Sequence, residues 1–258
     1  MLLKDKTALI FAATGAIGSA VARRLAAEGA RVFISGRNPD ALQLLARELD
    51  ARWQVVDATN EGDVRAYIER FGDNATDVDI VFNAIGPRPL EADYATPSTE
   101  MPFENFMLPL KMIVGSQFLT ARTAVRHMAK RHSGAIVTLS ASLSGMFVPF
   151  MSGITAACGA VEAMTRTLAA EFGPAGVRVN CVRAAGMPET RTIRETVARM
   201  SRTTGRTSQE AEQRTVANVL QRPVRVDETA RTVAYVASDY ASGVVGQVIN
   251  VCAGAIVS

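Results

Sequence analysis

The chain has 258 residues, of which 48% are hydrophobic and 21% are charged. This length and composition exclude a disordered chain and are sufficient for a large buried core. The formal net charge is +3, and acidic and basic residues are interleaved without a basic block. Such a distribution gives no indication of a nucleic-acid partner.

Short apolar runs alternate with amphipathic stretches from the N-terminus onward. The apolar runs predict seven strands, at residues 7–11, 31–35, 53–56, 79–82, 135–139, 178–182 and 247–251. The amphipathic stretches predict helices at residues 17–28, 39–49, 60–71, 104–132, 152–172 and 227–237. Because the strands are apolar on both faces, this alternation predicts an α/β fold of the Rossmann type. A doubly wound, parallel, seven-stranded sheet would lie between two helical layers, in a single domain over residues 1–258.

Two stretches interrupt the alternation. Residues 86–102 contain four prolines and little periodicity, which predicts a loop. Residues 184–225 form a polar insertion, for which we expect one or two short helices. Both follow the carboxyl ends of predicted strands, where doubly wound sheets bind their ligands. We therefore expect both stretches to line the substrate side of the molecule.

Thiols and imidazoles are too sparse for a metal centre. The cysteines Cys158, Cys181 and Cys252 are far apart and form no CxxC pair, and the only histidines are His127 and His132. We expect no bound metal. The apolar run at the N-terminus is too short for a secretion signal or a membrane span, so we expect reduced thiols, a cytoplasmic location and no membrane partner.

The segment IFAATGAIGSAVARRLA joins the first predicted strand to the first predicted helix. A dinucleotide-binding fold places the pyrophosphate at such a turn, on the N-terminus of the helix. The segment resembles the TGxxxGxG turn of short-chain dehydrogenases/reductases, with Ala12, Ala16 and Gly18 at the three glycine positions. A turn that only connects the strand and the helix is the alternative. The resemblance implies cofactor contacts from four residues of the turn, Ala13, Thr14, Gly15 and Ile17.

The second predicted strand ends in the sequence ISGR. Members of the family that prefer NAD carry an acidic residue there, which binds the ribose hydroxyls. In this chain Gly36 is followed by Arg37, and a guanidinium suits the 2′-phosphate of NADP. We expect NADP(H) as the cofactor, with NAD(H) as the alternative. A solvated surface arginine is the other interpretation of Arg37.

Two further segments resemble cofactor-binding parts of the family. In VVDAT, Asp57 and Ala58 match a pair that contacts the adenine. In VFNAIG, Asn83 matches a residue at the end of the fourth strand. For Asn83 we expect a structural role, with its side chain bonded to the backbone of the neighbouring strand. The resemblance then implies cofactor contact through the backbone of Ala84 and Ile85.

The resemblance extends over nearly the whole chain, through GAIVTLSAS, AVEAMTRTLAAEFGPAGVRVNCV and SDYASGVVGQVINVCAGA. It implies an oxidoreductase with a nicotinamide cofactor and a small-molecule substrate. It also implies a homo-oligomer, either a dimer or a tetramer. The subunits would meet through the helices expected at residues 104–132 and 152–172 and through the C-terminus.

In this family a Tyr hydroxyl transfers a proton at the substrate oxygen, and a Lys four residues later lowers its pKa. The match at AVEAMTRTLAAE assigns these positions to Ile154 and Cys158, and the position of the family's Asn falls near Ile113. An isoleucine cannot transfer a proton, so the usual general acid is absent. No tyrosine of the chain is followed by a Lys at the fourth position; the tyrosines are Tyr67, Tyr94, Tyr235 and Tyr240.

The position of the family's Ser, which polarises the substrate oxygen, is ambiguous. Counting back from Ile154 gives Ala141, and counting back from Gly145 gives Ser142. Ser140 is a third candidate. We take Ser142 as the one catalytic candidate.

Three other polar side chains have two interpretations each. Cys158 is either a weak acid in the site or a small buried residue of a helix. Arg183, at the end of the sixth predicted strand, and Arg88, in the loop, could each bind an anionic substrate or pair with a local acid.

The sequence therefore supports two functions. The first is an NADP(H)-binding oxidoreductase that acts on a carbonyl, an alcohol or an enone with atypical proton chemistry, carried out by Ser142 or by water. The second is a catalytically inactive homologue that serves as a dinucleotide-binding sensor or as a structural subunit.

Overall fold

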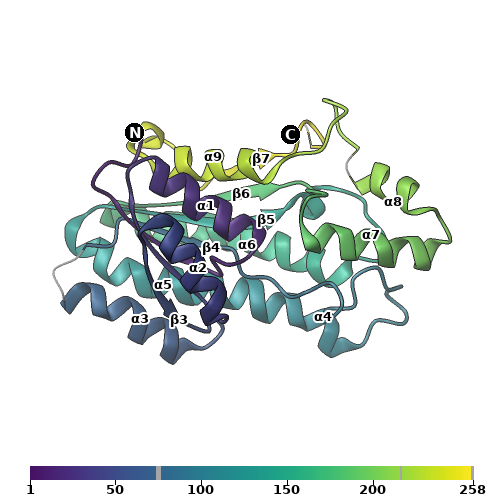
Figure 1. Ribbon diagram of the computed structural model, residues 1–258, viewed down its shortest axis with the longest axis horizontal. Helices are drawn as coiled ribbons and strands as arrows, with labels where there is room; N and C mark the ends of the chain where they lie inside the picture. The colour runs from purple at the N-terminus through teal and green to yellow at the C-terminus, as the bar shows by residue number, and fades with distance from the viewer. Residues whose placement is uncertain (74–76, 216, 257–258) are drawn as a thin grey trace.

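The computed structural model describes residues 1–73, 77–215 and 217–256. Its centre is a seven-stranded parallel sheet with the strand order β3-β2-β1-β4-β5-β6-β7 (Figure 1). This order reverses direction beside β1, as in a doubly wound Rossmann-type sheet, and confirms the predicted fold. The strands are β1 (Thr7–Phe11), β2 (Arg31–Gly36), β3 (Arg52–Val55), β4 (Ile80–Asn83), β5 (Gly134–Ala141), β6 (Val177–Ala184) and β7 (Val248–Val251).

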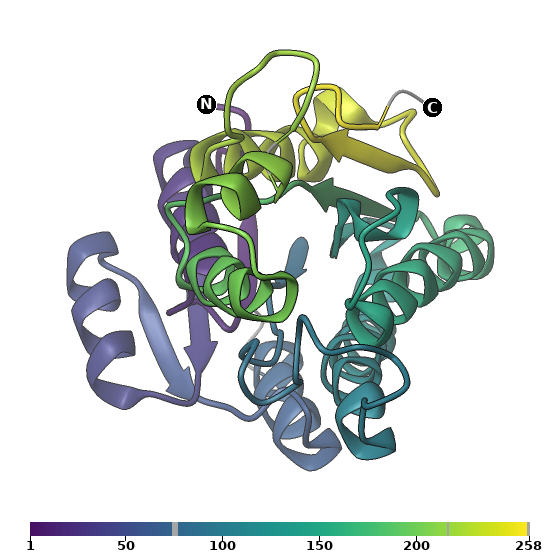
Figure 2. The ribbon, with the colours of Figure 1, turned by 90° about the vertical axis from the view of Figure 1, so that its right-hand side faces the viewer.

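Helices cover both faces of the sheet, and the two layers are seen end-on in Figure 2. Side chains of β1 alternate between the layers: Ala8 and Ile10 pack against one core, and Leu9 and Phe11 against the other. The first core is shared with α1 (Ala16–Ala27), α2 (Pro39–Leu49) and α9 (Val226–Ala237). The second is shared with α3 (Glu61–Asp73), α5 (Ser116–Met128) and α6 (Ser152–Phe172). Burial on both faces explains why the central strands β1 and β4 are apolar almost throughout, whereas the edge strand β3 is mostly exposed.

The prediction of one helix over residues 104–132 is wrong in its interior. The chain instead forms α4 (Phe103–Pro109), a π-helical turn η1 (Leu110–Gly115) and α5, followed by a 3₁₀ turn η2 (Ala129–Arg131). Pro109 ends α4, and a proline has no N–H for the helical ladder. A wide π turn accommodates this interruption and lets the chain continue in the same direction.

Strands β5 and β6 are longer than predicted, because they pair in register over eight residues from Gly134↔Val177 to Ala141↔Ala184. The register places Ser140 beside Arg183 at the carboxyl edge of the sheet.

The polar insertion at 184–225 contains two helices, α7 (Arg191–Thr204) and α8 (Ser208–Thr215), within the predicted number. Residue 216 of this insertion lies outside the described residues. Short 3₁₀ turns η3 (Ser142–Gly145), η4 (Gly173–Ala175) and η5 (Asp239–Ala241) complete the structure. Among the helices so described, none combines the length and apolarity needed to span a bilayer.

Candidate cofactor and catalytic site

The turn between β1 and α1 has the geometry of an anion-binding turn. Ala12 has a φ of 54°, a left-handed conformation that favours glycine. A Cβ added to Gly18 would lie 2.4 Å from the backbone oxygen of Ala12, so only glycine fits at this close approach. Gly15 is the N-cap of α1 and offers no side chain to the first N–H groups of the helix. Those groups are available to an anion.

The other residues of this turn for which we predicted cofactor contacts are Ala13, Thr14 and Ile17. Ala13 is buried, and its N–H donates to the backbone oxygen of Ser35 over 2.9 Å. Ile17 is partly buried against the core shared with α9. The Thr14 hydroxyl lies 3.6 Å from where a Cβ of Gly36 would be, so the turn after β1 touches the end of β2. The turn and Arg37 are therefore neighbours.

Arg37 and Asp57 lie together at the ends of β2 and β3. Arg37 is exposed and has no hydrogen bond or ion pair within the described residues. The pKa of Asp57 is lowered, chiefly because Thr59 donates its hydroxyl, at 2.7 Å, and its N–H to the carboxylate; the charge of Arg37 also contributes. Ala58 is buried in the core beneath this turn. The site thus offers a fixed carboxylate and an unpaired guanidinium.

Asn83 has a structural role, but its partners are not the predicted ones. Its amide nitrogen contacts the hydroxyls of Ser116 and Thr120 on α5 at 3.2 and 3.3 Å, and its oxygen accepts from the N–H of Ile85 over 2.9 Å. No bond to a neighbouring strand backbone is formed by this side chain among the described residues. The side chain of Asn83 therefore links α5 to the turn at Ala84 and Ile85. The backbone of Asn83 is paired with Phe11 of β1.

The positions that the resemblance assigns to the family's Asn, Tyr and Lys lie in one apolar group. Ile113 and Ile154 are each 7% exposed, and Cys158 is 1% exposed. We call this group the α6 cluster. Its buried members are Ala92, Tyr94, Ile113, Met151, Ile154, Ala157, Cys158, Val161 and Cys181.

Cys158 does not supply a thiolate in this environment. Its sulfur accepts a hydrogen bond from the N–H of Ala141 at 3.3 Å. Burial raises the pKa of the Cys158 thiol to about 12, so the thiolate is not formed at neutral pH. Of the two interpretations of Cys158, the small buried helix residue is the one the geometry supports.

The three candidate positions for the family's Ser differ in their hydrogen-bond partners. Ser140 donates to Glu162 over 2.8 Å, and Ala141 has no hydroxyl. Ser142 is 4% exposed, and its hydroxyl is fully enclosed with no hydrogen-bond partner among the described residues. A buried polar atom without a partner is rare and calls for an explanation such as a ligand. Ser142 is therefore the hydroxyl that is free for another role.

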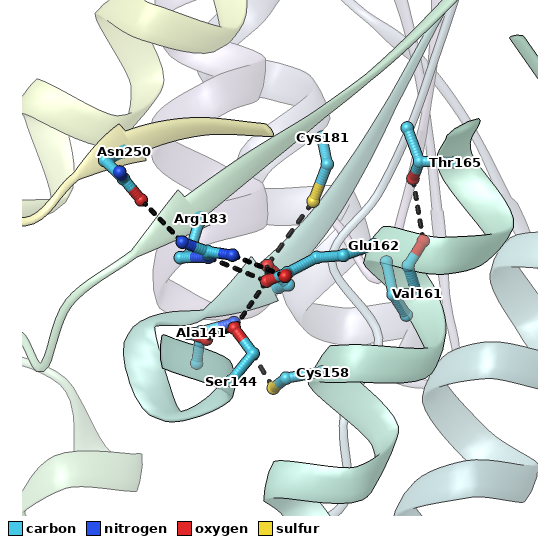
Figure 3. A network of polar contacts seen from close by, with 10 residues as sticks. Ala141, Ser144, Cys158, Val161, Glu162, Thr165, Cys181, Arg183 and Asn250 are labelled. Atoms are coloured by element: carbon cyan, nitrogen blue, oxygen red, sulfur yellow. Dashed lines mark hydrogen bonds and ion pairs between the residues drawn. The ribbon is translucent and has the colours of Figure 1, made fainter. Parts of the chain in front are cut away.

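A buried ion pair lies one helical turn beyond Cys158 (Figure 3). Two guanidinium nitrogens of Arg183 donate to the two carboxylate oxygens of Glu162, over 2.8 and 2.5 Å. Ser140 and Ser144 donate to the same carboxylate, and Asn250 on β7 accepts from Arg183 at 3.2 Å. The network joins α6, β5, η3, β6 and β7. It decides the interpretation of Arg183, which pairs with a local acid.

Sequence reasoning missed Glu162. The available signal was its spacing: an acidic residue four positions after Cys158 lies on the same face of the helix. Burial alone would raise the pKa of Glu162, but the hydrogen bonds from Arg183, Ser144 and Ser140 outweigh it and lower the pKa below its ordinary value. The carboxylate is therefore charged at neutral pH.

The loop at 86–102 and helix α7 are joined by charged contacts. Arg88 pairs with Glu195 at 2.9 Å, which decides its interpretation in favour of a local acid. Arg199 donates to the backbone oxygen of Tyr94 at 2.6 Å and pairs with Asp93 at 3.2 Å. The two irregular stretches therefore form one wall beside the α6 cluster.

Comparison with known proteins assigns this fold to a family. The family model described as enoyl-(acyl carrier protein) reductase matches residues 12–255. A cis-4-hydroxycyclohexanecarboxylate dehydrogenase of Sinomonas cyclohexanicum is 30% identical over 255 residues, which are 97% of this chain and 96% of the relative.

Solved structures agree. An actinorhodin polyketide ketoreductase variant with NADPH has a TM-score of 0.88 at 25% identity and covers 98% of each chain. NAD⁺-bound xylitol dehydrogenase has a TM-score of 0.91 at 23% identity, covering 98% of this chain and 100% of its own, and this likeness concerns the fold alone. Since the family model matches nearly the whole chain and the turn, sheet order and helical layers agree with it, the protein belongs to the short-chain dehydrogenase/reductase family.

Proposed function

We propose that the protein is an NADP(H)-dependent oxidoreductase that acts on an apolar carbonyl, alcohol or enone with atypical proton chemistry. The family membership supports the oxidoreductase class, and the unpaired guanidinium of Arg37 supports the phosphate-bearing cofactor. The turn at Ala13–Gly15 and the N-terminus of α1 would hold the pyrophosphate. We further propose a cytoplasmic homo-oligomer, a dimer or a tetramer, built from one domain over residues 1–258.

When bound, the reduced cofactor supplies a hydride to the substrate. The chain's own residues must then bind the substrate oxygen and manage a proton. The observation that carries the proposal is the enclosed, unpartnered hydroxyl of Ser142 beside the α6 cluster. Once the turn η3 moves to expose it, a hydrogen bond from Ser142 to the substrate oxygen would satisfy this hydroxyl and stabilise the charge that develops there.

The cofactor part of the proposal is tested by replacing Arg37 with alanine. Loss of a charge-assisted hydrogen bond to the 2′-phosphate should weaken NADPH binding about 10- to 100-fold and leave NADH binding unchanged. Titration calorimetry with each cofactor measures both dissociation constants. Arg47→Ala on α2 is the matched control, since Arg47 is also an exposed arginine. Equal binding of NADPH by wild type and Arg37→Ala would remove Arg37 from the site.

The catalytic part is tested with Ser142→Ala. We expect kcat for reduction of cyclohexanone or 2-cyclohexen-1-one by NADPH to fall about 100-fold, as on loss of one donor to a developing oxyanion. NADPH binding should not change. Ser144→Ala is the control, because the Ser144 hydroxyl is already bonded to Glu162, and its loss should lower stability more than kcat. An unchanged kcat in Ser142→Ala contradicts a catalytic role.

A specific observation favours a second candidate, a non-catalytic dinucleotide-binding homologue. Ile113 and Ile154 carry no exchangeable side-chain proton, and Cys158 is buried in the same apolar α6 cluster with its thiol protonated at neutral pH, so the family's Asn, Tyr and Lys have no counterpart at these positions. The same titrations discriminate the candidates. Tight NADPH binding without turnover of any ketone or enone favours the sensor or structural subunit.

A further inference from the structure

We propose that Tyr94, in the loop at residues 86–102, supplies the hydroxyl that binds the substrate oxygen and donates its proton when a carbonyl is reduced. This inference rests on the proposed function and names the proton donor that function requires. Tyr94 belongs to the α6 cluster together with Ile113, Ile154 and Cys158. Its side chain therefore packs, from a different element, in the same group as the positions to which the resemblance assigns the family's Tyr and Lys.

The Tyr94 hydroxyl is free to bind a ligand. The residue is 5% exposed, and its oxygen has no hydrogen bond to any residue in 1–73, 77–215 or 217–256. Unlike the hydroxyl oxygens of Tyr67 and Ser142, it is not among the fully enclosed polar atoms, so part of its surface is accessible. It also lies close enough to the Cys158 thiol for the two groups to interact electrostatically.

The backbone on both sides of Tyr94 is held in a strained conformation. Asp93 has a φ of 45° and Ala95 a φ of 64°, in the left-handed region that non-glycine residues rarely adopt. Helix α7 holds this backbone: Arg199 donates to the oxygen of Tyr94 at 2.6 Å, and Thr203 donates to the oxygen of Ala95 at 2.6 Å. Strain of this kind persists where the surroundings enforce it, and it concentrates at functional sites. The contacts hold the backbone on both sides of Tyr94 in place.

The proton balance of the step is complete. Addition of a hydride to the carbonyl carbon, which a reduced nicotinamide would supply, would move the π electron pair of the C=O bond to the oxygen. The O–H bond of Tyr94 breaks, its proton bonds to that oxygen to give the alcohol, and the phenolate regains a proton from water.

The environment of Tyr94 favours reduction over oxidation. Burial raises the pKa of Tyr94 above that of a free phenol. An alkoxide is a stronger base than a phenolate, so the Tyr94 proton still moves to the reduced substrate. Oxidation of an alcohol would need the phenolate at the start, and the raised pKa makes that species scarce.

The test is Tyr94→Phe, which keeps the ring and its packing and removes only the hydroxyl. We expect kcat for reduction of cyclohexanone or 2-cyclohexen-1-one by NADPH to fall about 100-fold or more, with NADPH binding unchanged. Tyr235→Phe is the control, since Tyr235 is 44% exposed on α9. A wild-type kcat in Tyr94→Phe overturns the assignment and leaves the proposed function intact.

A second measurement does not depend on turnover. Protein labelled with 3-fluorotyrosine gives fluorine NMR signals, and the one missing from Tyr94→Phe is that of Tyr94. We expect this signal to shift on NADPH addition and to differ with NADP⁺, whose nicotinamide ring is positively charged, while the Tyr67 signal stays fixed. A Tyr94 signal that does not respond to bound cofactor overturns the inference. Absence of NADPH binding overturns the inference and the proposed function together, whereas a responsive Tyr94 signal without turnover overturns the proposed chemistry alone.

Discussion

Replacing Glu162 with alanine is expected to lower the free energy of unfolding by about 3–5 kcal/mol. The substitution leaves the guanidinium of Arg183 in a site where its side chain is only 14% exposed, without the carboxylate that now neutralises it. It also removes the acceptor of Ser140 and Ser144. Urea denaturation of wild type and Glu162→Ala, followed by circular dichroism, measures the difference.

The matched control is the double variant Glu162→Met with Arg183→Met. Replacing a buried pair with apolar residues of similar volume often costs little, so we expect this variant to recover most of the stability. The pH dependence gives a second check. Because the folded pKa of Glu162 is lowered, its contribution is present above the unfolded value of about 4.3 and is lost as the pH falls through the folded value. This part of the acid sensitivity should disappear in the double variant. A single variant as stable as wild type would contradict the role assigned to the pair.

Cys158→Lys restores one residue of the family pattern. We expect it to lower the free energy of unfolding by about 4 kcal/mol or more at pH 7. A lysine at a site with 1% exposure loses about three or more pKa units, and each unit corresponds to 1.36 kcal/mol. The nearby carboxylate of Glu162 cannot neutralise the ammonium, because Arg183 already occupies both of its oxygens. Denaturation at several pH values measures the loss.

Cys158→Met is the control, since methionine has nearly the length of lysine and no charge. We expect Cys158→Met to lower the free energy of unfolding by only about 1–3 kcal/mol, the cost of overpacking a core. For Cys158→Lys the penalty should shrink as the pH rises toward 10, where the unfolded lysine also becomes neutral. Equal stability of the two variants at pH 7 would show that water or a carboxylate reaches position 158. The α6 cluster would then be more open than its apolar contacts indicate.

The sequence by itself determined the fold class. Seven apolar runs alternating with amphipathic stretches favour a parallel sheet covered by helices on both faces, and the structure has this arrangement. The sequence also determined that no tyrosine is followed by a lysine at the fourth position, because that census needs no coordinates. It did not predict the π turn after Pro109: the pattern over residues 104–132 indicated one helix, and a proline does not specify the form that the chain takes around it.

Only the tertiary structure decided which polar side chains meet. Glu162 and Arg183 are 21 residues apart, and they pair because α6 packs on the face of β6 from which Arg183 projects. Tyr94 packs in the α6 cluster from a loop whose sequence has no hydrophobic periodicity. Arg199 of α7 binds the backbone oxygen of Tyr94. Local periodicity reports which residues are buried. It does not report which buried faces oppose each other, and contacts between distant segments depend on that choice.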